Sequence, residues 1–310
     1  MTSRHLAAIQ KSTIVRSFGL LEQIAPSAGA RWAETLWFTV PRTRGPRARQ
    51  ATGGHPFQVQ VDGHTVAGEI WGGRPDGARG QSDARTVYLV HGWGGWRWQL
   101  DPFVGPLVDA GFRVVAFDAP GHGGSGPGPE GPGRSNILEF ADALAAVVAA
   151  YGPARAVVAH SLGSTATAFA VSRGLPVDRL VFVSPMADPL PYTRAFAARL
   201  GFGERIRTRL VARVERRIGT PMSAFDVPAM AHRVATPPLL LVHDRLDAET
   251  GWADSAAIAR SWPDARLVTT AGLGHRRILR APAVVAEATA FVAGQPSATT
   301  VPGRPDRVPS

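Results

Sequence analysis

The stretch Val157-Val158-Ala159-His160-Ser161-Leu162-Gly163 decides how the rest of the chain is interpreted. The apolar run that ends at Ala159 predicts a buried strand, and the small residues 163–168 are compatible with a helix. A sharp turn between them must lift Ser161 off the sheet in a strained conformation that only small neighbours tolerate. The pattern matches G-x-S-x-G with Ala159 at the first glycine. Because so short a match is weak, it needs partners elsewhere in the chain.

A serine hydroxyl becomes a useful nucleophile only beside a base that a third group orients. Two later apolar runs, 239–242 and 266–269, each lead into a polar loop. The first loop contains Asp247 and the second contains His275, so the chain order is serine, aspartate, histidine. This order predicts a triad of Ser161, Asp247 and His275. Asp244, which stands nearer the strand end, remains the alternative acid.

An oxyanion position is also present, because the apolar run 87–90 leads into His91-Gly92-Trp93-Gly94-Gly95. Glycines at this place let backbone N–H groups face a developing oxyanion. We expect the N–H groups of Trp93 and Leu162 to be the donors. The residues expected to support these loops are His91, Gly92, Gly94, His160 and Gly163.

These features together resemble the α/β-hydrolase superfamily over residues of about 86 to 294. The segment Asp118-Ala119-Pro120-Gly121-His122-Gly123-Gly124-Ser125 is similar to the D-x-P-G-H-G-x-S segment of esterase- and lyase-like members. The resemblance implies an α/β-hydrolase fold in which Ser161 is the nucleophile, His275 the general acid/base and Asp247 the orienting acid.

The resemblance also implies a function. It implies a serine hydrolase that cleaves small carboxylic esters, or close thioester or lactone analogues, without a cofactor. Acyl transfer, C–C bond hydrolysis and perhydrolysis use the same triad and stay open as alternatives. So does a non-catalytic, ligand-binding member of the fold.

The order of apolar runs and helical patterns predicts an α/β fold with a mostly parallel, doubly wound sheet. An antiparallel hairpin around Gly63-His64 precedes it. The predicted strands are 86–90, 113–117, 155–159, 179–183, 238–242 and 266–269, and the predicted helices are about 99–110, 135–151, 163–173, 253–261 and 281–293.

Four parts follow from this order. Residues 1–50 form a helical extension with a basic linker, and residues 51–184 with 236–294 form the core. Residues 185–235 form a helical cap, because Ile206, Leu210 and Val214 repeat every four residues. Arginines beside this stripe are expected to be solvated, and selection of an anionic substrate is the alternative. Residues 295–310 are expected to be disordered.

Composition excludes several classes of function. The chain has no cysteine, which rules out disulfides and a thiolate nucleophile or metal ligand. The net charge of +10 comes from arginine apart from Lys11, and the aromatic–basic interleaving of a nucleic-acid surface is absent, so we expect no nucleic-acid partner. We also expect no metal site.

The sequence predicts the location and the partners of the protein only in part. No signal peptide or membrane span is evident, so a cytoplasmic location is expected. Contact of the basic N-terminal extension with a membrane surface is possible. The oligomeric state stays open.

Some conspicuous residues have ordinary explanations. We expect His91, His122 and His160 to be structural hydrogen-bonding groups, because no ligand partner stands at metal spacing. Asp118 is expected to hold its own glycine-rich turn. The neighbouring tryptophans Trp93, Trp96 and Trp98 either line a substrate pocket or pack in the core.

Overall fold

The strand–turn–helix unit around Ser161 lies in the middle of one sheet in the computed structural model, which describes residues 3–41, 53–72 and 86–295. Among these residues eight strands pair in the order β1-β2-β4-β3-β5-β6-β7-β8. The strands are β1 (His55–Val61), β2 (His64–Trp71), β3 (Thr86–Val90), β4 (Arg113–Phe117), β5 (Ala154–His160), β6 (Leu180–Val183), β7 (Leu239–Asp244) and β8 (Ala265–Thr270).

The sheet is parallel from β4 to β8, and the leading hairpin is antiparallel. This arrangement confirms the predicted fold class. The predicted basic linker at 42–50 and the predicted disordered tail from 296 lie outside the described residues.

Helices cover both faces of the sheet, as strands with apolar residues on both sides require. Within β3, Tyr88 and Val90 belong to one hydrophobic cluster, whereas Val87 and Leu89 belong to the other. This alternation is the two-residue period of a strand. The flanking helices are α3 (Val104–Asp109), α4 (Ile137–Tyr151), α5 (Leu162–Ser172), α9 (Trp252–Ser261), α10 (Gly274–Arg277) and α11 (Pro282–Ala293), and short 3-10 helices span Arg97–Phe103, Met222–Phe225 and Ile278–Arg280.

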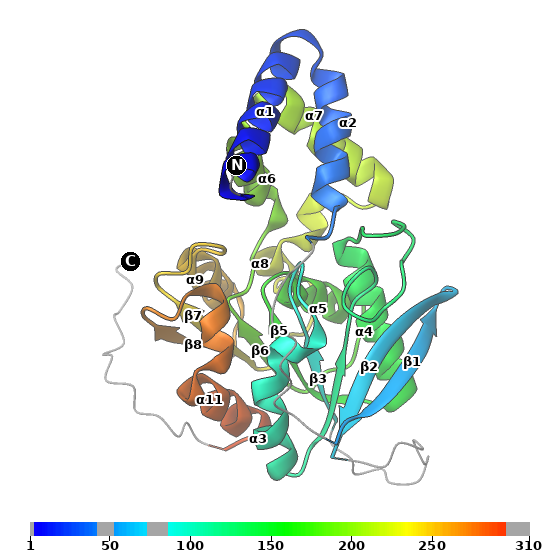
Figure 1. The fold of residues 1–310 in the computed structure, drawn as a ribbon. Helices are drawn as coiled ribbons and strands as arrows, with labels where there is room; N and C mark the ends of the chain where they lie inside the picture. The colour runs from blue at the N-terminus through cyan, green and yellow to red at the C-terminus, as the bar shows by residue number, and fades with distance from the viewer. Residues whose placement is uncertain (1–2, 42–52, 73–85, 296–310) are drawn as a thin grey trace.

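A second body of helices stands above the carboxyl ends of the parallel strands (Figure 1). It contains α6 (Pro189–Leu200) and α7 (Glu204–Ile218), together with the N-terminal α1 (Ser3–Ile24) and α2 (Pro26–Phe38), whereas the short α8 (Val227–Met230) packs in the core of the sheet domain. We call α1, α2, α6 and α7 the cap. Among the described residues, no helix combines the length and apolar composition that crossing a bilayer requires.

The four cap helices share one hydrophobic cluster although α1 and α2 are about 150 residues or more before α6 and α7 in the sequence. Phe18 of α1 is fully buried, stacks on Trp32 of α2 and contacts Phe202 beside α7. The Cβ of any residue larger than Gly29 would collide with Ile206, so glycine permits close approach of α2 and α7. Helices α1 and α2 therefore pack with α6 and α7 as one unit.

Polar contacts join the same helices. The Glu22 carboxylate accepts hydrogen bonds from the N–H groups of Gly203, Arg205 and Ile206 at 2.9–3.1 Å. The Arg205 guanidinium donates back to the carbonyl of Glu22, and Arg213 pairs with the buried Glu34. Arg205 and Arg213 thus hold α1 and α2 rather than forming only a solvated face.

Replacing Glu22 by alanine is expected to lower the free energy of unfolding by about 1–2 kcal/mol, because three N–H groups at the start of α7 lose their acceptor. Urea unfolding measures this loss. Gln23→Ala is the matched control, since its exposed side chain makes no such contact. Equal stability of Glu22→Ala and Gln23→Ala would contradict the role of this carboxylate.

Candidate active site

Ser161 occupies the strained turn that the sequence predicts between β5 and α5. Its backbone has φ 54° and ψ −125°, an unfavourable region for a residue with a side chain. A Cβ at Gly92 would lie 2.8 Å from the Cβ of Ser161, and one at Gly163 would collide with the His91 carbonyl. Both glycines are therefore required for β3, β5 and α5 to meet this closely.

The loop after β3 leaves the N–H of Trp93 free of protein acceptors in the described part of the chain. Its neighbours are engaged: Gly95 donates to the Gly92 carbonyl at 2.9 Å, and Gly94 donates to Nε2 of His122 at 3.1 Å. The N–H of Leu162 is the first of a helix and has no partner within the helix. Both predicted oxyanion donors are thus available.

Two buried histidines hold this loop. The His91 Nε2 accepts the Ala119 N–H, so its Nδ1–H donates to the Gly92 carbonyl at 2.8 Å. The His122 Nδ1–H donates to the Pro120 carbonyl, because its Nε2 accepts from Gly94. Burial lowers the pKa of His91 to about 4 and that of His122 to about 3, so both imidazoles are neutral.

Asp118 holds the glycine-rich turn, as predicted. Its carboxylate accepts the N–H groups of Gly124 at 2.7 Å and of Arg97 at 2.6 Å, and it also forms an ion pair with the Arg97 guanidinium. The carboxylate is therefore engaged by the turn and by the start of the Arg97–Phe103 segment.

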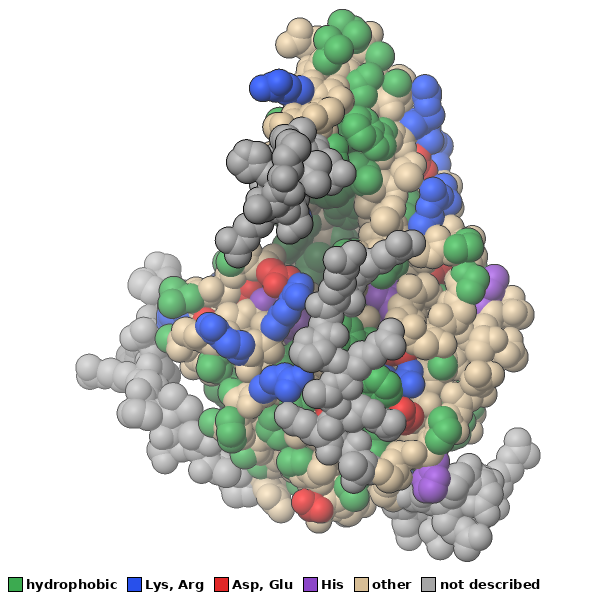
Figure 2. Space-filling model, viewed as in Figure 1, with side chains coloured by type: hydrophobic (Ala, Val, Ile, Leu, Met, Phe, Trp, Pro, Cys, Tyr) green, Lys and Arg blue, Asp and Glu red, His purple; other side chains and the backbone are tan. Residues whose placement is uncertain are grey.

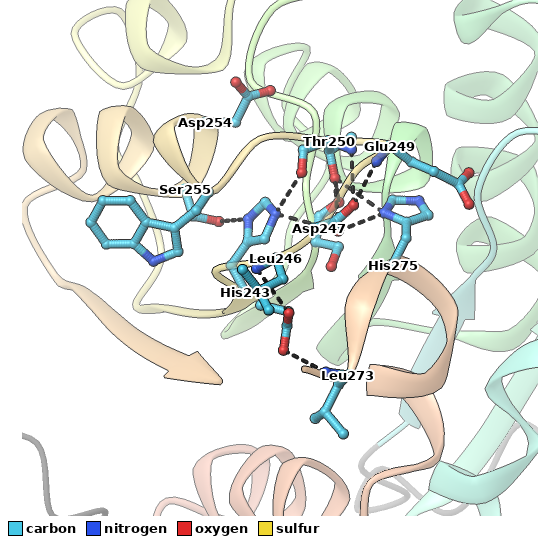
Figure 3. Close-up of polar contacts among 12 residues, drawn as sticks. His243, Leu246, Asp247, Glu249, Thr250, Asp254, Ser255, Leu273 and His275 are labelled. Atoms are coloured by element: carbon cyan, nitrogen blue, oxygen red, sulfur yellow. Dashed lines mark hydrogen bonds and ion pairs between the residues drawn. The ribbon is translucent and has the colours of Figure 1, made fainter. Parts of the chain in front are cut away.

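The loops after β7 and β8 bring Asp247 and His275 together (Figure 3). Oδ2 of Asp247 lies 2.8 Å from Nδ1 of His275. Since a carboxylate only accepts, Nδ1 carries the proton, and the neutral imidazole has its basic lone pair on Nε2. This is the tautomer that a general base requires.

The Asp247 carboxylate is completely buried and stays ionised. Burial by itself would raise its pKa, but hydrogen bonds from His243 and His275 hold the pKa below its usual range. The N–H groups of Glu249 and Thr250 donate to its other oxygen at 2.8 and 3.1 Å.

Asp244, the alternative acid, has a different position. Its carboxylate accepts the N–H groups of Leu246, Gly272 and Leu273 and the hydroxyl of Thr270. It therefore joins the loop after β7 to the loop before His275, and the described residues show no contact between it and the imidazole.

No hydrogen bond joins the Ser161 hydroxyl to His275 among the described residues. The two are neighbours through His160, whose ring centroid lies 4.5 Å from that of His275. Such bonds are often long in enzymes without substrate and tighten only in the complex.

Thr250 and His243 also contact the candidate triad, although the sequence pattern did not predict either of them. The Thr250 hydroxyl lies 3.1 Å from Nδ1 of His275 and 3.1 Å from the Ser184 carbonyl. Fully buried His243 lies between Ser255 Oγ at 2.7 Å and the Thr250 carbonyl at 3.1 Å, and 3.5 Å from Asp247 (Figure 3). A polar residue three positions after a candidate acid was the available signal for Thr250.

The three tryptophans have two kinds of surroundings. Trp93 packs against His122 and Phe140 at the edge of the core. Trp96 and Trp98 line a cavity of about 1000 Å3 next to the oxyanion loop. No group of three or more histidines or carboxylates in the described ranges is arranged to hold a metal ion.

The surface is hollowed between the cap and the sheet domain, and hydrophobic side chains line this recess (Figure 2). The recess lies over the carboxyl ends of the strands, which is where parallel α/β sheets bind ligands (Figure 1).

The neutral histidines lead to a pH prediction. His91, His122 and His160 have pKa values lowered to about 4, 3 and 3, below the unfolded value near 6.5. Each therefore opposes folding increasingly as pH falls below about 6.5, by about 1.4 kcal/mol per pH unit. We expect their ring 15N signals to stay those of neutral imidazoles from pH 8 to 5. Titration of any of the three near pH 6.5 would contradict this electrostatic description.

Comparison with known proteins agrees with the fold. A family model described as "alpha/beta hydrolase fold" matches residues 85–200, and one described as "TAP-like protein" matches residues 218–298. A dihydrolipoyllysine-residue acetyltransferase component of an acetoin cleaving system from Cupriavidus necator is 37% identical over 115 residues, which are 35% of this chain and 29% of that protein. The chain thus spans less than a third of the length of the curated relatives it matches.

Two solved structures illustrate the likeness of fold. A membrane phospholipase A described as a bacterial virulence factor has a TM-score of 0.59 at 17% identity, over 94% of this chain and 99% of that one. An esterase from Pyrococcus furiosus has a TM-score of 0.58 at 20% identity, over 83% of this chain and 97% of that one.

Proposed function

Because the chain belongs to the α/β-hydrolase superfamily, we propose that it is a serine hydrolase that cleaves carboxylic esters or the related thioesters and lactones. One observation carries the proposal. The buried carboxylate of Asp247 fixes the tautomer of His275, and the loop that carries His275 lies next to Ser161 on its strained turn. The esterases among similar folds support hydrolase activity, and the proposed substrate class comes from the site.

In the proposed mechanism the Ser161 hydroxyl attacks the ester carbonyl, and Nε2 of His275 accepts its proton. Asp247 stabilises the imidazolium that forms. The negative charge on the carbonyl oxygen is stabilised by the N–H groups of Trp93 and Leu162. In other enzymes one such donor contributes about 3–4 kcal/mol in the transition state.

The tetrahedral intermediate then collapses. The C–O bond to the leaving group breaks, and His275 returns the proton to the departing alcohol. Water attacks the acyl group on Ser161 by the same route, with His275 again as base, and releases the acid. The reaction consumes the ester and one water and releases an acid and an alcohol, so the proposed mechanism uses no cofactor.

The substrate is proposed to be a small ester with an apolar acyl or alcohol group. The hydrophobic recess between cap and sheet domain supports this choice. A panel of p-nitrophenyl esters of increasing acyl length tests it, with turnover expected for short or medium chains.

Acyl transfer is the second candidate, because the relative from Cupriavidus necator is named as an acetyltransferase component. Product analysis separates the two. Release of free acid in water supports hydrolysis, whereas turnover that requires an added alcohol, thiol or amine supports transfer. No turnover by the folded protein under either condition would contradict both.

A further inference from the structure

His160 connects three parts of the proposed site. It is the last residue of β5, directly before Ser161, and it is only 4% exposed. A Cβ at Gly92 would lie 3.1 Å from its Nδ1, and its ring contacts that of His275 on the other side. The imidazole therefore lies between the oxyanion loop and the loop of the histidine.

The hydrogen bonding of His160 fixes its tautomer. Nε2 lies 2.9 Å from the backbone carbonyl of His275. Because a carbonyl oxygen only accepts, Nε2 carries the proton and the ring donates. Nδ1 is buried and has no hydrogen-bond partner among the described residues, so it is the unprotonated nitrogen.

A charged His160 would be strongly disfavoured. A second N–H at Nδ1 would find no acceptor in the part of the chain that the structure describes, and the nearby His275 and Arg276 oppose positive charge. Burial is the largest cause and lowers the pKa of His160 to about 3, although Asp247 opposes this shift. The side chain therefore stays a neutral, one-donor group while His275 accepts and returns a proton in the proposed mechanism.

We propose that His160 is a positioning residue that sets the distance between the Ser161 hydroxyl and His275 by holding the backbone of the histidine. This role rests on the function proposed above. Asp247 restrains the His275 side chain through Nδ1, and His160 restrains its backbone carbonyl. Together the two contacts define where Nε2 can lie relative to Ser161, although His160 itself touches no reacting atom.

We expect a large effect on kcat, because proton transfer from serine requires a short distance between the Ser161 hydroxyl and Nε2 of His275. A displacement of about 1 Å can cost on the order of 100-fold in rate. Loss of the His160 donor should therefore lower kcat on the order of 10- to 100-fold and leave KM little changed, because the side chain is buried and only 4% exposed.

The test compares three substitutions of His160 that differ in where they place an N–H donor. Glutamine carries its amide nitrogen at the reach of Nε2, asparagine carries it at the reach of Nδ1, and phenylalanine keeps a ring without a donor. We expect kcat to decrease in the order wild type, His160→Gln, then His160→Asn and His160→Phe together. Circular dichroism and Tm check the fold of each variant.

Reaction with a fluorophosphonate separates positioning from structural damage. We expect His160→Phe to bind one probe per chain at completion, as the wild type does, but with a rate constant lowered as much as kcat. If His160→Phe reacted with the probe at the wild-type rate constant, the positioning role would be overturned and the proposed function would stand. The same holds if only a fraction of the His160→Phe molecules reacted, at the wild-type rate. A folded wild type that takes up no probe would overturn the proposed function and this role with it.

Discussion

Replacing Ser161 with alanine is expected to lower kcat for an activated ester by about 10^5- to 10^6-fold, the loss seen when a serine hydrolase loses its nucleophile. KM should change little, because the recess and the loop amides remain. The fold should be retained, since alanine tolerates the tight approach of Gly92 and Gly163 as well as serine does. Steady-state kinetics with a p-nitrophenyl ester measure the loss.

Ser172→Ala is the matched control for this experiment. Ser172 ends α5, the helix that begins after Ser161, and its hydroxyl donates to the Phe169 carbonyl of the same helix. Its kcat should stay within twofold of the wild type. Residual activity of Ser161→Ala above a few per cent would mean that another group attacks the substrate.

The substitution Asp247→Asn should lower kcat by about 10^4-fold while leaving the protein folded. An asparagine amide no longer selects the tautomer with the proton on Nδ1 of His275, and it cannot stabilise the imidazolium. The same kinetics and a pH profile of kcat/KM measure this effect.

Two further carboxylates make this prediction specific. Glu249→Gln makes the same chemical change at an exposed carboxylate two positions away and should stay within twofold of the wild type. Asp244→Asn should mainly lower Tm and have a much smaller effect on kcat than Asp247→Asn. The reason is that Asp244 holds backbone N–H groups of the loop that carries His275. If Asp244→Asn lowered kcat as much as Asp247→Asn does, the assignment of Asp247 as the orienting acid would be contradicted.

The sheet could be predicted because its determinants are local. The strands β3 and β4 have the predicted bounds, since each is a short apolar run between polar or glycine-containing turns. The α/β order then fixes where each strand ends and which loops share one edge. This is why residues of three distant loops could be named as one candidate site from their positions alone.

The cap could not be predicted in the same way. Its stability depends on pairs such as Glu22 with the start of α7 and Glu34 with Arg213, which are separated by about 180 positions. An amphipathic pattern indicates that a helix buries one face, but it does not identify the partner. The sequence pattern therefore does not predict that α1 and α2 share one hydrophobic cluster with α6 and α7.

The surroundings of the triad were equally hard to predict. Thr250 contacts His243, Ser184 and His275 through hydrogen bonds that depend on side-chain orientation. The sequence named His160 only as part of the supporting loop, since nothing in a one-dimensional pattern shows that its ring reaches the His275 carbonyl.

The most direct test of the account is the covalent capture of Ser161. Intact-mass analysis of wild type treated with a fluorophosphonate should show one adduct per chain, and peptide mapping should place it on Ser161. Ser161→Ala should show none. A folded wild type without an adduct, or an equal adduct on Ser161→Ala, would contradict the assignment of this serine as the nucleophile.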